Sequence, residues 1–134
     1  MVRAARIALA LYLLAGAAIT LGPTPDGVFG RGQRAVGEVT DGALSAGAIE
    51  AGANIAVFVP LGFLLCQAFP AVRRSLMWLL CVTASAGIEA YQYLLPGRDA
   101  SVRDVVMNGL GAALGVLLSW VLDGVLARRR ARSG

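Results

Sequence analysis

The sequence predicts an all-α membrane protein whose four transmembrane helices form an antiparallel bundle. Three observations support this: the composition, four long apolar stretches, and an uneven distribution of arginine. The chain has 134 residues, of which 57% are hydrophobic and 15% are charged, and its mean hydropathy is +0.71. A soluble domain of this length would carry more charge on its surface. We therefore expect residues 1–134 to form a single membrane domain.

The apolar stretches are candidate spans because a helix needs about 20 mostly apolar residues to cross a bilayer. They lie at residues 5–21, 51–69, 76–95 and 105–126. Residues 22–50 are rich in glycine and form an outer loop, whereas the later links, "PAVRRS" and "PGRDASVRD", are short. Short links force consecutive helices to run antiparallel. A basic tail, residues 127–134, follows the last span.

The first span has a second interpretation. Its basic start, apolar middle and small residues, in "RAARIALALYLLAGAA", also fit a cleaved signal peptide. The orientation of the other spans would be the same in either case.

Arginine supplies all twelve basic residues and sets the predicted orientation. Eight of them flank the spans on one side: Arg3, Arg6, Arg73, Arg74, Arg128, Arg129, Arg130 and Arg132. The other side has Arg31, Arg34, Arg98 and Arg103, accompanied by acidic residues. Because cytoplasmic loops carry the excess of positive charge, we expect a multi-pass plasma membrane protein with both termini in the cytoplasm.

The composition also narrows the function. The absence of histidine removes the commonest general base and the usual zinc or haem ligand, and we predict no cofactor, metal site or catalytic residue. Cys66 and Cys81 lie in apolar runs and are expected to pack as small apolar residues. Scattered arginines without interleaved aromatic residues do not predict a nucleic-acid partner; membrane lipids are the expected partner.

Polar residues gather near the predicted outer surface. The orientation places groups from the last three spans, and from the turn before the fourth, within one or two helical turns of that surface. We predict that they form a ligand-binding cluster consisting of Glu50, Asn54, Glu89, Gln92, Arg98, Asp104 and Asn108. The alternative is that they only bind helices to one another, at about 0.6 kcal/mol for each hydrogen bond.

Glu89 is expected to have a partner, because a carboxylate in lipid is costly when unpaired. Arg98 is the first candidate, since a guanidinium can bind a carboxylate through two hydrogen bonds. Asp104 has a second interpretation as the cap of the fourth helix, and Ser101 is an equally reasonable cap.

Small residues in "GLGAALG" predict close helix packing. Gly111 and Gly115 are four residues apart, a spacing that lets two helix backbones approach each other. The same face is a candidate contact in a homo-oligomer. Pro60, in the second span, predicts a kink there.

The chain resembles the VanZ-like membrane proteins. The resemblance rests on "NIAVFVPLGFLL", "SAGIEAYQ" and "PGRDASVRDVVMNGLGAALG", which occur in the family's order and spacing over about residues 50–118. Asp99 departs from the pattern, which favours a small or hydroxylated residue there. The resemblance implies a bacterial cell-envelope protein, from a family named for a member associated with low-level resistance to teicoplanin, a lipoglycopeptide antibiotic.

Three functions follow as hypotheses. The first is a non-enzymatic protein that binds an amphiphile, such as a lipid headgroup or a lipoglycopeptide, at the outer leaflet. The second is an intramembrane hydrolase or transferase for lipid-linked cell-wall precursors, with Glu50, Glu89 and Asp104 as acid–base groups. The third is a small oligomeric transporter subunit.

Overall fold

The described part of the chain is helical. A computed structural model describes residues 1–20, 35, 36, 38, 43–94 and 101–133, and this part contains helices and no strand. The helices are α1 (Val2–Thr20), α3 (Ala46–Ala68), α4 (Arg74–Tyr93) and α5 (Val102–Arg132). Each predicted span coincides with one helix, and the basic residues up to Arg132 extend α5 instead of forming a separate tail.

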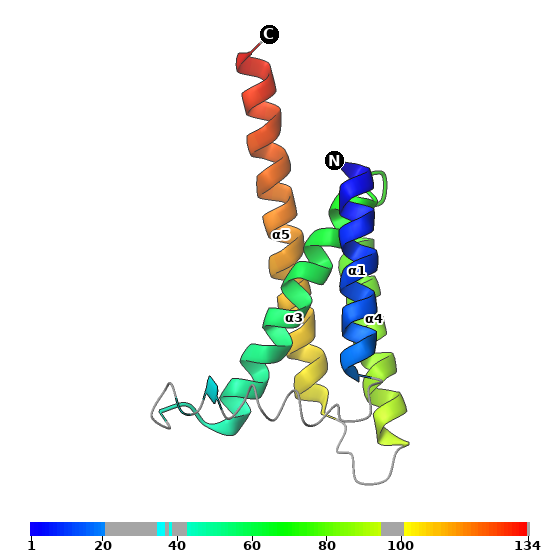
Figure 1. Cartoon of the computed structure of the whole chain (residues 1–134), viewed down its shortest axis with the longest axis vertical. Coiled ribbons are helices and arrows are strands. Elements are labelled where there is room, and N and C mark those ends of the chain that lie inside the picture. The colour runs from blue at the N-terminus through cyan, green and yellow to red at the C-terminus, as the bar shows by residue number, and fades with distance from the viewer. Residues whose placement is uncertain (21–34, 37, 39–42, 95–100, 134) are drawn as a thin grey trace.

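Consecutive long helices run in opposite directions (Figure 1). The start of α1 and the end of α5 lie at one end of the molecule. The start of α3, the end of α4 and the start of α5 lie at the other end, which we call the loop end. As a consequence, α3 and α5 are parallel to each other. The loop end therefore collects the three segments that carry the predicted polar cluster.

The α3–α5 interface depends on residues without side chains. Gly62, Gly111 and Gly115 are buried, and a β-carbon added to Gly115 would lie 2.7 Å from the backbone nitrogen of Phe63. One added to Gly111 would lie 2.9 Å from Cα of Ile55. The two backbones thus touch where glycine allows it. This agrees with the close packing expected from "GLGAALG", and it leaves the Gly111/Gly115 face covered by α3 of the same chain.

Pro60 lies inside α3, which continues without interruption from Ala46 to Ala68. Proline removes one backbone donor from the helix, yet the helix persists through it. Ser45 begins α3, since its hydroxyl accepts a hydrogen bond from the backbone N–H of Ala48 at 3.2 Å.

The first helix is attached to α3 at two points. The Arg6 Nε donates a hydrogen bond to the backbone carbonyl of Ala68 at 3.1 Å, at the end of α3, and its guanidinium lies 5.5 Å from the centre of the Phe69 ring. The Tyr12 hydroxyl donates to the carbonyl of Val57. Leu9 is buried between these contacts. α1 therefore packs as an integral helix of the bundle.

The outer surface is apolar. α3 and α5 are long and apolar enough to cross a membrane, and only 22% and 33% of their most apolar stretches are buried. The core helix of a soluble protein would instead be mostly buried. Leucine, valine and tryptophan cover the exposed side of α5, as Leu110, Leu114, Leu117, Leu118, Trp120 and Val121 show. Exposed apolar surface of this extent marks contact with a membrane or a partner.

Candidate functional site

The start of α3, the end of α4 and the start of α5 lie at the loop end (Figure 1), and these segments carry the predicted polar residues that the structure describes. Within α4 and α5, two antiparallel neighbours, the polar residues face each other in pairs. These pairs show which of the predicted residues already form hydrogen bonds within the bundle and which could still bind a ligand.

Glu89 is bound to the start of α5. Its carboxylate accepts a hydrogen bond from the backbone N–H of Ser101 at 2.8 Å. Ser101 is the N-cap residue of α5, and its own hydroxyl makes no capping bond. Because the first N–H groups of a helix are unpaired and carry partial positive charge, a carboxylate from α4 is well placed there. Glu89 thus docks the end of α4 onto the start of α5.

This contact decides between the capping alternatives. Asp104 is not the cap, because it lies in the first turn of α5, three residues after Ser101. A carboxylate at that position interacts favourably with the helix dipole. The proposed Glu89 partner, Arg98, lies outside the described residues, as does Asp99, so that pairing stays a prediction.

Asn108 lies deeper between α4 and α5 and is only 9% exposed. Its amide Nδ2 donates a hydrogen bond to the Ser85 hydroxyl at 2.8 Å, and Ser85 is 1% exposed. The amide oxygen, Oδ1, is buried and has no hydrogen-bond partner within the described part of the chain. A buried acceptor without a donor is uncommon and costly. Asn108 therefore offers one open acceptor in the interior.

Arg103 supplies a cation at the same end. It is exposed, and its guanidinium lies against Gly47 in the first turn of α3, with Nη1 2.7 Å from where a β-carbon would be. Among the described residues, the ion pair is Arg74–Asp123, and Arg103 has none. A cation at a helix start is electrostatically unfavourable, so this guanidinium is available to an anionic group.

The other predicted residues differ in exposure. Glu50 is exposed on α3, one turn after the helix begins, and Asn54 is half-buried one turn further along. Gln92 and Asp104 are half-buried. The helix segments at the loop end carry Glu50, Asn54, Glu89, Gln92, Asp104 and Asn108. In the described part of the chain, the side-chain hydrogen bonds of this set join Glu89 to Ser101 and Asn108 to Ser85, and not members of the set to one another.

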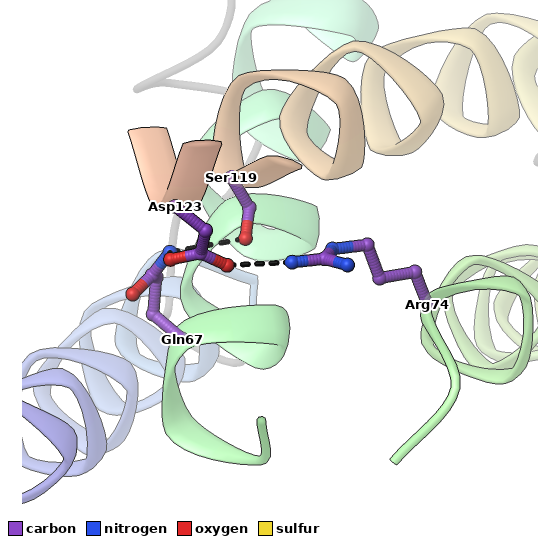
Figure 2. A network of polar contacts seen from close by, with 4 residues as sticks. All are labelled: Gln67, Arg74, Ser119 and Asp123. Carbon is purple, nitrogen blue, oxygen red and sulfur yellow. Dashed lines mark hydrogen bonds and ion pairs between the residues drawn. The ribbon is translucent and has the colours of Figure 1, made fainter. Parts of the chain in front are cut away.

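A second polar group, missed at the sequence level, lies at the opposite end. Gln67 Nε2 donates hydrogen bonds to the Ser119 hydroxyl at 3.0 Å and to Asp123 Oδ1 at 3.1 Å. Arg74 binds the other carboxylate oxygen of Asp123 at 2.5 Å. Figure 2 shows these four side chains meeting between α3, α4 and α5. The available signal was the spacing of Ser119 and Asp123, four residues apart on one face of an apolar helix.

The comparison with protein families gives a direct match. The family model described as VanZ/LLP1 matches residues 9–123. No curated protein and no solved structure matches the chain. The matched region is longer than the stretch on which the resemblance rests, and it includes most of α1 as well as α3, α4 and the greater part of α5.

The family match and the apolar surface of the helices both indicate a membrane protein. Two long apolar helices have only 22% and 33% of their most apolar stretches buried, as expected of a chain that lies in a membrane. The predicted number of four spans and the cytoplasmic location of the termini stay predictions. The match over most of the chain establishes that this protein belongs to the VanZ/LLP1 family.

Proposed function

We propose that the chain is a bacterial cell-envelope protein that binds an amphiphile at the loop end and thereby contributes to low-level resistance to teicoplanin. The observation that carries this proposal is the presence of unpaired polar groups at one end of an apolar bundle. Within the residues that the structure describes, Arg103 is a cation without an ion pair, and Asn108 has a buried acceptor without a donor. An anionic amphiphile would pair with the exposed Arg103, and a hydrogen-bond donor of the ligand would have to enter between α4 and α5 to reach the buried Asn108 oxygen.

The roles of the residues are assigned from their chemistry, their burial and the contact of Glu89 with Ser101. Arg103 and Arg98 would bind an anionic group of the ligand. Gln92 and Asn54, both half-buried, would hydrogen-bond its neutral polar groups. Glu89 would hold α5 in place through Ser101, and the exposed apolar faces of the helices would accept an acyl chain. Binding sites commonly combine apolar walls with a few convergent polar groups.

The proposal is tested by binding of teicoplanin to the purified full chain in a neutral detergent, beside vancomycin, which lacks the fatty acyl group. We expect tighter binding of teicoplanin, and a loss of roughly ten- to a hundredfold in Arg103→Ala, since a hydrogen bond to a charged group contributes about 1.5–3 kcal/mol. Arg128→Ala is the matched control, because Arg128 is exposed near the far end of α5. Equal binding of both antibiotics, or equal effects of the two substitutions, would contradict the proposal.

Resistance itself is tested in cells. Overexpression should raise the teicoplanin concentration needed to stop growth more than the vancomycin concentration, and deletion should lower it. Arg98→Ala and Glu89→Ala should abolish this effect while the protein is still inserted in the membrane. Protection at the level of the unsubstituted chain in both variants would end this interpretation.

A further inference from the structure

A groove of about 330 Å³ lies at the end of the molecule opposite the loop end. The start of α1, the end of α3 and the last third of α5 form its walls. Its apolar lining comes from Met1, Val2, Pro70, Leu126 and Ala127, and its polar lining consists of Gln67, Asp123 and Arg130. It is therefore separate from the predicted cluster and from the site proposed above.

The polar network fixes the orientation of one groove residue. Gln67 has two amide hydrogens, and they are directed to Ser119 and Asp123. Its carbonyl oxygen points away from Ser119 and Arg74 (Figure 2), and it has no hydrogen-bond partner among the described residues. Because both amide hydrogens are engaged, the side chain cannot rotate without losing two hydrogen bonds. Gln67 thus presents an acceptor of fixed orientation, which is open to a hydrogen-bond donor from solvent or from a ligand.

The network also sets the charge of the groove. Both carboxylate oxygens of Asp123 are engaged, one by Gln67 and the other by Arg74, whose positive charge offsets that of the carboxylate. Arg130 is exposed and forms no ion pair in the described part of the chain. The groove therefore offers a cation, a neutral acceptor and apolar walls.

We propose that this groove binds a phosphate ester that carries free hydroxyl groups, namely the glycerophosphate headgroup of a membrane lipid. Arg130 binds the phosphate, since a guanidinium donates two hydrogen bonds to phosphate oxygens. A headgroup hydroxyl donates to the Gln67 carbonyl, and the apolar residues contact the first carbons of the acyl chains. A choline headgroup fits poorly, because it has no donor for Gln67 and brings its own cation near Arg130.

The test measures binding of dihexanoyl phosphatidylglycerol to the purified full chain in a neutral detergent. We expect Arg130→Gln to weaken binding roughly tenfold, because a charge-assisted contact is lost. Arg129→Gln removes the same charge from the neighbouring residue, which does not line the groove, and should change binding less than twofold. Equal losses in both variants would show general attraction to the basic helix end and would overturn the proposal.

Two further ligands test the chemistry. Dihexanoyl phosphatidylmethanol has the same charge but no free hydroxyl, and should bind several-fold more weakly than phosphatidylglycerol; equal binding would overturn the role of Gln67. Inorganic phosphate at the same concentration should not displace the lipid. Displacement would identify a phosphate site and overturn the lipid assignment. Teicoplanin binding at the loop end is unaffected by either result.

Discussion

At the scale of single residues, the polar groups of α4 and α5 act in pairs. Arg74 binds Asp123, Ser85 binds Asn108, and Glu89 binds the backbone of Ser101. In an antiparallel pair, residues near the start of one helix face residues near the end of the other. Accordingly, Arg74 at the start of α4 contacts Asp123 in the last third of α5, and Glu89 near the end of α4 contacts Ser101 at the start of α5. Polar contacts between membrane helices each contribute modestly, but together they fix the register of α4 against α5.

Glu89 gives the sharpest test at this scale. Glu89→Gln retains an oxygen that accepts from the Ser101 N–H and should lower the free energy of unfolding by less than about 1 kcal/mol, since only the charge–dipole interaction is lost. Glu89→Ala leaves that N–H unpaired and should cost about 1–3 kcal/mol. Unfolding by denaturant in detergent micelles measures both, and equal losses would contradict the capping role.

The same pair of variants bears on enzymatic chemistry. A glutamine cannot transfer a proton, so an intramembrane hydrolase that used Glu89 as an acid or base would lose its activity in Glu89→Gln. We expect ligand binding and resistance to persist in this variant. Loss of function with unchanged stability would favour the hydrolase or transferase hypothesis.

At the scale of elements, close contact of α3 and α5 is the central feature of the bundle. Both helices carry glycine where their backbones meet, and the buried Ala112 lies against Gly62. Lipid tails are as apolar as leucine, so helices in a membrane associate through close packing and not through exclusion of water. Small side chains at this contact are therefore required, whereas elsewhere on α5 they are not.

Two glycines of α5, one inside the α3–α5 contact and one outside it, test whether the contact needs small residues. Gly115→Ala places a methyl group against the backbone of Phe63 and Val59 and should destabilise the protein by about 1–3 kcal/mol, as overpacking does. Gly124 has nothing within 4 Å of an added β-carbon, and Gly124→Ala should be neutral or stabilise the helix by up to about 1 kcal/mol. The thermal unfolding midpoint in detergent checks both. Similar shifts of the two midpoints would argue against the close α3–α5 contact.

At the scale of the whole molecule, the bundle exposes many of its large apolar residues and buries the Ser85–Asn108 pair. α5, with 31 residues, is about 46 Å long at 1.5 Å per residue, which exceeds the hydrocarbon thickness of about 30 Å. Its last turns carry Arg128, Arg129, Arg130 and Arg132. A helix of this length can cross a bilayer and extend its basic end into the headgroup region, where anionic lipids attract it.

The orientation of the bundle in the membrane can be tested with reporter fusions. A fluorescent protein fused after Arg132 should be fluorescent, and alkaline phosphatase at the same position should be inactive, because the positive-inside rule places this end in the cytoplasm. Phosphatase fused after Ser45, in the segment preceding α3, should be active. The reverse pattern would place the loop end, and the proposed amphiphile site with it, on the cytoplasmic side.

The sequence by itself determined the helical class, the approximate helix bounds and which helix ends carry the predicted polar residues. Apolar length and arginine placement are local properties, readable without knowing how the helices pack. It also indicated that Gly111 and Gly115 lie in a close helix contact, because their spacing puts them on one face.

Only the tertiary structure decided which polar groups meet. Successive residues are rotated by about 100° around a helix, so a pairing depends on the rotation and register of two helices at once, and packing sets both. For this reason the contact of Glu89 with the Ser101 backbone and the pairing of Ser85 with Asn108 appear only in the structure. The pairing of Glu89 with Arg98 stays a prediction, because Arg98 lies outside the described residues. The network of Gln67, Ser119 and Asp123 escaped prediction because its members, up to 56 positions apart in the chain, become neighbours only when α3 packs on α5.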